Sequence, residues 1–207
     1  MSAPRFRRYP SETRAAMLVE AGLACLARGG IQGFTLDNIC READASRGLV
    51  AHHFGSKDGL LAACYGAMYD RVMGALRPDG GTADLGQLLD ACFAPGVFNG
   101  ESLRVWLALW GEIAHSEGLR ETHRRLYAAY RAEVAAAIAA EAAARGLRVE
   151  AEALAAAFIA LSDGVWLEHA IDPDLMPVAQ ARGACRALLE AHLGPLRRAD
   201  MDLSAGA

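Results

Sequence analysis

The side chains with the clearest binding chemistry lie between residues 35 and 57, where hydrogen-bond donors alternate with small residues. Arg47 and His52 carry N–H groups that can pair with the edges of bases, and Gly48 would permit close approach to them. Leu49 could contact a thymine methyl group. This combination predicts contact with a DNA major groove. The expected DNA-binding set is Thr35, Ser46, Arg47, Gly48, Leu49, Ala51, His52, His53 and Lys57.

Three members of that set suit phosphate oxygens rather than bases. Thr35, His53 and Lys57 can each donate a hydrogen bond to a phosphate, which fixes the register of a protein on a duplex without reading its sequence. Ser56 is a typical N-cap, so it would bring Lys57 to the amino end of a helix, where anions are favoured. We therefore expect these three residues to bind the phosphate backbone of DNA.

Two short helices must position these side chains. Leu36, Ile39, Cys40 and Ala43 follow the i, i+3, i+4, i+7 spacing of one apolar helical face, and Thr35 is a suitable N-cap. The pattern breaks at Asp44 and Ala45 and restarts behind Ser46.

On the second helix Val50 and Phe54 should face inward, so that Gly48, Ala51 and His52 point outward. This is the pattern of a helix-turn-helix. The same residues would also fit an ordinary piece of a helical bundle, and the pattern alone leaves that alternative open.

This stretch resembles the amino-terminal domain of the tetracycline-repressor (TetR) family over roughly residues 12 to 64. The segments that carry the resemblance are Gly29–Phe34, Thr35–Phe54 and Gly55–Leu61. Four residues depart from the family pattern: Asp44 stands at the turn glycine, Ala45 at the following valine, and Ala51 and His53 at two tyrosines. The resemblance implies a DNA-binding regulator, with His53 in place of a tyrosine that would anchor the backbone.

Composition favours an all-α protein. The 207 residues include abundant alanine, 7% aromatic residues and no alternating β-branched run. We find no run of about 18 uncharged apolar residues and no signal-peptide core, which predicts a cytoplasmic protein. The five cysteines are widely spaced, so we expect reduced core thiols and neither disulfides nor metal ligands. No metal or cofactor is expected.

Charge is unevenly distributed along the chain, whose net charge is −4. Residues 1–60 hold eight basic and six acidic side chains, whereas the remainder holds 13 and 19. A basic amino-terminal region and an acidic remainder are expected if only the amino-terminal region contacts DNA phosphates. Arg5, Arg7 and Arg8 form an amino-terminal arm that could enter a minor groove or simply remain solvated.

We expect three segments: an arm and helix-turn-helix domain at 1–55, a helical ligand-binding and dimerisation domain at 56–195, and a frayed tail at 196–207. Apolar periodicity, interrupted by Gly or Pro, predicts six further helices after the helix-turn-helix. They span residues 56–76, 83–94, 102–117, 119–145, 150–171 and 177–193, and a helix at 11–30 precedes the motif.

The helix at 150–171 is apolar on more than one side, so it must be central or lie at an interface. Paired with a second copy of the chain, it and the last helix would form a four-helix bundle. A dimer also supplies two recognition helices about 34–36 Å apart. The expected interface residues are Leu154, Phe158, Leu161, Val165, Ala181, Cys185 and Leu188; the alternative is that they belong to the core of one chain.

The second half of the chain resembles choline-responsive repressors of betaine synthesis, a branch of the same family, in segments 106–115 and 161–168. That resemblance implies a quaternary ammonium effector, for which aromatic rings and a carboxylate are suitable partners. The expected pocket residues are Tyr65, Trp106, Trp110, Tyr130, Asp163 and Trp166. Tryptophans at helical spacing are also typical of plain core packing.

Together these patterns predict a dimeric, ligand-responsive transcriptional regulator, most simply a repressor that binds a palindromic operator and is released by a small molecule. A helical dimer that binds a small molecule or a protein, but no DNA, is the alternative. An enzyme is not expected, because the sequence contains no nucleophile elbow, phosphate-binding loop, His-Glu-x-x-His or Cys-x-x-Cys motif.

Overall fold

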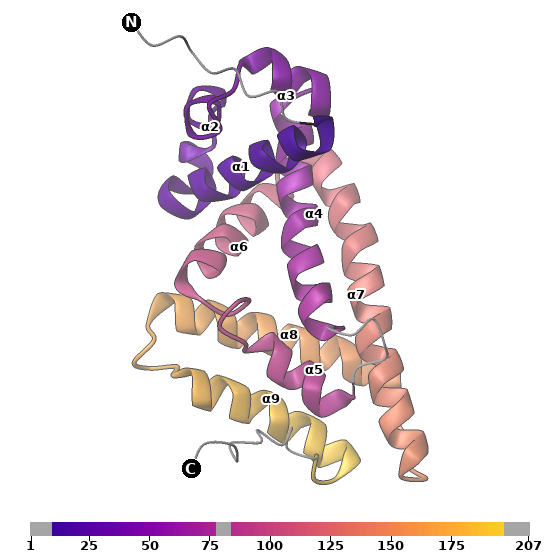
Figure 1. The fold of residues 1–207 in the computed structure, drawn as a ribbon. Helices are drawn as coiled ribbons and strands as arrows, with labels where there is room; N and C mark the ends of the chain where they lie inside the picture. The colour runs from indigo at the N-terminus through magenta and orange to yellow at the C-terminus, as the bar shows by residue number, and fades with distance from the viewer. Residues whose placement is uncertain (1–9, 78–83, 197–207) are drawn as a thin grey trace, which may run out of the picture. The chain divides into compact units, whose positions relative to one another are not determined.

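The computed structural model describes residues 10–77 and 84–196, and all regular structure in these two ranges is helical (Figure 1). The predicted all-α fold is confirmed. The arginine-rich arm lies outside the described residues, as does the predicted tail beyond Leu196. The helices are α1 Ser11–Gly33, α2 Leu36–Glu42, α3 Arg47–Phe54, α4 Lys57–Leu76, α5 Leu85–Cys92, α6 Gly100–Ile113, α7 Glu117–Ala144, α8 Ala151–Ile171 and α9 Val178–Leu193.

The chain forms two compact units. The first comprises residues up to 67 together with residues 104–122, and the second comprises residues 68–103 and residues from 123 onward. Helices α4, α6 and α7 each begin in one unit and end in the other. Because a helix is a stiff element, each of these three helices is a covalent mechanical link between the units.

The core of the first unit is built on α1, which packs against α2. Leu18, Ala21, Gly22 and Cys25 form the predicted buried stripe on α1. A Cβ on Gly22 would lie 2.7 Å from the Cys64 sulfur, so a larger residue there would push α4 away from α1. The expected end of this helix at Gly30 is visible as a kink with φ 54° and ψ −154°, a conformation that only glycine adopts readily.

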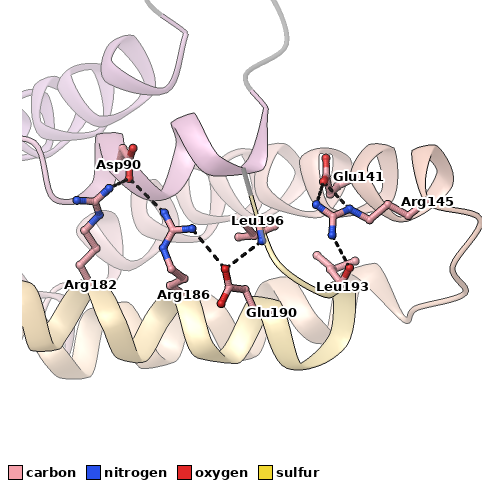
Figure 2. A network of polar contacts seen from close by, with 8 residues as sticks. All are labelled: Asp90, Glu141, Arg145, Arg182, Arg186, Glu190, Leu193 and Leu196. Carbon is pink, nitrogen blue, oxygen red and sulfur yellow. Dashed lines mark hydrogen bonds and ion pairs between the residues drawn. The ribbon is translucent and has the colours of Figure 1, made fainter. Parts of the chain in front are cut away.

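The second unit contains α5, α8 and α9, with α9 packed against both of the others. Figure 2 shows how charged side chains tie α9 to α5. Arg182 donates to the carboxylate of Asp90, and Arg186 lies 3.9 Å from the same carboxylate oxygen. Arg186 also pairs with Glu190, which accepts the backbone N–H of Leu196 at 3.0 Å. The network fixes the carboxyl end of α9 and the residues that follow it.

Among the predicted helix boundaries that differ from the structure, two have a clear local cause. Helix α6 ends at Ile113 rather than near residue 117, because Ser116 begins the next helix by accepting the N–H of Leu119 at 3.2 Å. Helix α5 is confined to Leu85–Cys92 and starts with a capping box, in which Asp84 and Gln87 bond each other's backbone N–H groups. The end of α6 and the start of α5 are thus set by capping interactions, which act more locally than apolar periodicity.

One finding amends the expectation about membrane segments. Helix α8 is long and apolar enough, by length and composition alone, to resemble a membrane-spanning helix. It packs against α9, however, and Leu154, Phe158 and Ile159 are buried within the chain. Core helices of globular domains commonly have this character.

Candidate DNA-binding surface and aromatic clusters

The first element of the candidate DNA-binding surface is the α2 helix with its caps. Thr35 accepts the backbone N–H of Asn38 at 3.2 Å, as an N-cap should, and Asn38 donates to the carbonyl of Gly33 at 3.0 Å. Ile39 is fully buried and Ala43 nearly so, which confirms the inward face of this helix. Its outer face carries Asp37 and Arg41.

The turn between α2 and α3 depends on Asp44. With φ at 47°, Asp44 is the only non-glycine residue in ranges 10–77 and 84–196 that adopts a positive φ. Asp can adopt this left-handed conformation at some energetic cost, which is how it substitutes for a turn glycine. The backbone N–H of Ala45 then bonds the Cys40 carbonyl at 2.9 Å and closes the turn. A helix-turn-helix is thus formed despite the missing glycine.

Helix α3 presents most of the predicted contact residues to solvent. Val50 is buried, as predicted, whereas Phe54 is half-buried. Ser46 occupies the N-cap position with extended backbone, but its hydroxyl accepts no N–H from the first turn, which corrects its expected role as a side-chain cap. The exposed members of the set are Thr35, Ser46, Arg47, Gly48, Ala51, His52 and Lys57, and the half-buried members are Leu49 and His53.

Two glycines of this surface differ in their surroundings. Among residues 10–77 and 84–196, a Cβ added to Gly48 would meet only the Ser46 hydroxyl oxygen, at 3.7 Å, so packing in this part of the chain does not require glycine there. A Cβ on Gly59 would lie 2.1 Å from the carbonyl oxygen of Phe54, so glycine is needed for α4 to approach the end of α3. Open space at Gly48 is what close approach of a ligand backbone or base would use.

The start of α4 matches the sequence prediction. Ser56 accepts the N–H of Gly59 at 3.0 Å, and Lys57 is the exposed first residue of the helix. A lysine beside free backbone N–H groups is a suitable place for a phosphate.

The sequence did not predict that Arg47, the arginine expected to read a base, pairs with Asp37. The Nε atom of Arg47 donates to Oδ1 of Asp37 at 3.0 Å, and Nη2 donates to the same oxygen. Hydrogen bonding to this carboxylate, followed by its charge, raises the pKa of Arg47, which therefore stays protonated. Asp37 and Arg47 are ten residues apart, a spacing that helical periodicity does not pair, so the sequence gives no sign of their contact. The turn at Asp44 brings the two side chains together.

The predicted pocket residues fall into two clusters, one in each unit. In the first unit the ring of Trp106 lies 5.8 Å from that of Tyr65, edge to face, and 5.8 Å from that of Trp110. Tyr65 and Trp106 are buried, and Trp110 is half-buried. These contacts fit ordinary packing as well as a ligand-binding wall.

In the second unit Asp163 has the most unusual environment. Its half-buried carboxylate has no hydrogen-bond or ion-pair partner among the described residues, and burial raises its pKa to about 7. Asp163 in turn raises the pKa of Tyr127 and Tyr130, for which burial is the larger cause. An unpaired carboxylate near aromatic hydroxyls favours a cation in its vicinity.

The second unit also contains two other predicted pocket residues, Tyr130 and Trp166, each packed against an aromatic ring. Tyr130 is buried, lies 6.2 Å from the ring of Tyr69, and its hydroxyl is 3.8 Å from the Cys92 sulfur. Trp166 packs edge to face on Phe98 at 5.3 Å. The indole N–H of Trp166 is buried without a hydrogen-bond partner in the described part of the chain, although buried indoles usually find one.

The expected dimer-interface residues require a correction. Leu154, Phe158 and Val165 of α8 are buried within the single chain, and so are Ala181 and Cys185 of α9. These five residues belong to the core of the single chain, which is the alternative that the sequence left open. Leu161 and Leu188 are only half-buried.

All five cysteines are free thiols, and burial raises the pKa of Cys92 to about 12 and that of Cys185 to about 11.

The faces of α8 and α9 turned away from that core are also apolar. Between Ala153 and Gly164, every exposed residue of α8 is alanine or glycine. Larger exposed apolar residues follow where α8 ends and α9 begins, and their exposed fractions are 39% for Leu167, 68% for Ile171, 76% for Leu175 and 39% for Val178. On α9 the exposed residues include Gly183, Ala187 and Ala191.

Comparison with known families gives two matches that together span most of the chain. Residues 18–64 match the bacterial regulatory proteins of the tetR family, and residues 81–194 match the C-terminal domain of BetI-type transcriptional repressors. The first match covers the helix-turn-helix, and the second covers the helices from α5 to α9.

Characterised relatives agree with both matches. An HTH-type transcriptional regulator BetI from Paraburkholderia phymatum is 31% identical over 176 residues, which is 79% of this chain and 84% of the relative. The protein of the same name from Paraburkholderia xenovorans is 33% identical over 171 residues, or 77% and 83% of the two chains.

Solved structures share the fold. A putative transcriptional regulator from Pseudomonas aeruginosa superposes with a TM-score of 0.75 at 34% identity, covering 90% of this chain and 93% of that one. A putative regulator from Saccharomonospora viridis, solved in complex with choline, gives a TM-score of 0.71 at 20% identity over 87% and 97% of the two chains. At that identity the second likeness concerns the fold alone.

Proposed function

This chain belongs to the TetR family of bacterial transcriptional regulators and carries a C-terminal domain of the BetI type, and from that premise we propose that it is a dimeric repressor released from a palindromic operator by a quaternary ammonium compound. Membership in a family of transcriptional regulators also confirms the prediction that the chain is not an enzyme. A cytoplasmic location is part of the proposal.

The observation that carries the proposal is the outward face of α3. Arg47, Gly48, Ala51 and His52 are exposed on one short helix, while Val50 anchors its other side. No packing contact among the described residues requires a glycine at position 48. Arg47 and His52 would read base edges, and Thr35, His53 and Lys57 would hold phosphates.

A dimer is supported by the exposed apolar faces of α8 and α9. Small side chains such as Ala157, Ala160 and Ala187 permit close helix packing, and exposed Leu167 and Ile171 would lose contact with water. In a four-helix bundle with a second copy, these faces would be the interface, in place of the buried residues expected at first.

A cationic effector is supported by Asp163. Its carboxylate is half-buried and unpaired in the described part of the chain, and Tyr127, Tyr130, Phe98 and Trp166 supply aromatic surface in the same unit. Each cation–π contact would contribute roughly 0.5–2 kcal/mol. The unpartnered N–H of Trp166 would suit an effector that also carries an oxygen acceptor, as choline does.

The protein would leave its operator if the effector binds more tightly to a state in which the two DNA-binding domains of the dimer no longer match the spacing of the operator half-sites. A ligand shifts such an equilibrium only through its different affinities for the two states. The helices α4, α6 and α7 would carry the change, because each belongs to both units.

The proposal is tested by selecting duplexes from fragmented genomic DNA and measuring their binding in the presence of choline chloride. We expect one or a few palindromic sites, bound in a salt-dependent manner and released by choline. The matched control is 3,3-dimethylbutan-1-ol, which has the shape of choline without its charge and should release nothing. Equal release by both compounds would contradict a cation-binding site, and no enriched site would contradict the regulator itself.

A further inference from the structure

The ion pair between α2 and α3 points to a role for Asp37 in DNA recognition. We propose that Asp37 is a specificity-determining residue that holds the Arg47 guanidinium so that its outer edge reads guanine in the operator. The inference rests on the proposed DNA-binding function and adds which base is read and what positions the reader.

The geometry of the pair places the arginine in a fixed orientation. Arg47 is the first residue of α3, and both Nε and Nη2 donate to one oxygen, Oδ1, of Asp37 on α2. The Arg47 and Asp37 side chains remain 64% and 72% exposed. The pair therefore stands on the surface that carries the expected DNA contacts, and it is not a core ion pair.

The hydrogen bonds to Asp37 use only one edge of the guanidinium. A guanidinium has five N–H donors in a planar fork, and the edge formed by Nε and Nη2 is the one that faces Asp37. The outer edge, formed by Nη1 and the second hydrogen of Nη2, points away from the carboxylate. Two parallel N–H donors on that edge match the O6 and N7 acceptors of guanine.

Prior anchoring lowers the cost of recognition. A free arginine side chain loses rotamer freedom when it docks on a base, whereas Arg47 is already restrained by two hydrogen bonds. The fixed orientation also makes the contact more selective, because a side chain that cannot swing away cannot compensate for a wrong base.

The exposed carboxylate adds a second contribution to specificity. Asp37 cancels the charge of Arg47, so the pair contributes little to sequence-independent attraction by phosphates. Without guanine opposite, the surface would bring a carboxylate toward DNA with no compensating bidentate contact. Discrimination of this kind, by penalising the wrong partner, is a common source of specificity.

A second exposed ion pair in the same unit provides a control. Arg28 of α1 donates to both carboxylate oxygens of Glu42 at the end of α2, at 2.5 and 3.4 Å. Neither residue belongs to α3 or to the expected DNA-binding set. Removing Glu42 changes the net charge of the unit as much as removing Asp37 does, but leaves Arg47 anchored.

The experiment is selection from a random duplex library, followed by sequencing, with wild-type protein and the variants Arg47→Ala, Asp37→Asn, Asp37→Glu and Glu42→Gln. Thermal unfolding confirms that each variant is folded. The position read by Arg47 is the one at which Arg47→Ala loses base preference. At that position we expect guanine in the wild type, and about a tenfold loss of guanine preference with Asp37→Asn.

The controls make the outcomes distinct. Glu42→Gln should keep the guanine preference, and Asp37→Glu should restore part of it if the longer carboxylate still reaches Arg47. An unchanged or sharpened preference in Asp37→Asn would overturn the inference while leaving the regulator intact, as would a base other than guanine at that position. Failure of the wild-type protein to enrich any motif would instead contradict the proposed function.

Discussion

Arg104 of α6 donates from Nε to the main-chain carbonyl oxygen of Ala27 in α1 at 2.9 Å, across 77 residues of sequence. Ala27 lies three residues before the kink at Gly30, and Arg104 lies in the part of α6 that belongs to the first unit. A helix of the BetI-type domain is thereby bonded to the first helix of the DNA-binding region. The contact gives that region a defined attachment point on α6.

Replacing Arg104 with leucine should therefore lower stability and weaken the response to effector. The Ala27 carbonyl would lose a hydrogen bond from a charged donor, which typically contributes about 1.5–3 kcal/mol. We expect a lower free energy of unfolding in urea and, at saturating choline, less release of DNA than in the wild type. Arg125→Leu, at an exposed position of α7, is the control and should change neither quantity.

The two glycines of the DNA-binding surface should respond oppositely to alanine. Gly48→Ala places its methyl group in open space and improves helix propensity by up to about 1 kcal/mol, so the protein should unfold at a higher temperature but bind its operator more weakly. Gly59→Ala forces a methyl group against the Phe54 carbonyl and should lower the melting temperature. A Gly48→Ala protein with unchanged operator affinity would argue against close approach of DNA at α3.

Lys57 should contribute attraction to DNA without sequence preference. Substitution with alanine removes one expected phosphate contact from each protomer, so the slope of log affinity against log salt should decrease by about one per protomer. Affinity for operator and for unrelated duplex should fall by similar factors in fluorescence anisotropy titrations. Arg148→Ala, an exposed change in the second unit, should leave the slope unchanged.

Ionisation of Asp163 should make choline binding depend on pH. Its pKa of about 7 lies above the ordinary value of 3.8, so the folded state binds more protons than the unfolded state between those pH values. For this group, stability must then fall as pH rises through that window and level off above it. Choline needs the carboxylate, so its affinity should rise from pH 6 to pH 8.

Asp163→Asn provides the matched variant for that prediction. It should remove this part of the stability loss between pH 4 and 7, and it should abolish the pH dependence of choline binding measured by calorimetry. A wild-type protein that binds choline equally well at pH 6 and pH 8 would show that Asp163 does not meet the cation.

Local signals predicted the two helices of the helix-turn-helix, whereas its assignment to DNA binding also needed the resemblance to a known family. Thr35 and Ser56 cap their helices as expected, and Val50 faces inward, because caps and apolar spacing act within one or two turns. Asp44 was correctly expected to tolerate the left-handed turn. The pairs Asp37–Arg47 and Arg104–Ala27 could not be predicted, since they depend on how the helices pack.

The proposed dimer face could not be identified from sequence for a different reason. Helix α8 is rich in alanine and apolar on nearly every side, so periodicity does not distinguish the face that packs in its own chain from the face left exposed. Phe158 fills the core, whereas Ala153, Ala157 and Ala160 remain outside. Most of the residues expected at the interface, such as Phe158, are therefore core residues of the single chain.

The central claim is that two copies of the chain read one palindromic site. Sedimentation velocity of the protein with a fluorescent duplex from the genomic selection, beside a scrambled duplex of equal length, tests it most directly. We predict a free dimer, a complex of two chains per duplex, and its loss on addition of choline chloride. A free monomer, or equal binding to the scrambled duplex at physiological salt, would contradict the account.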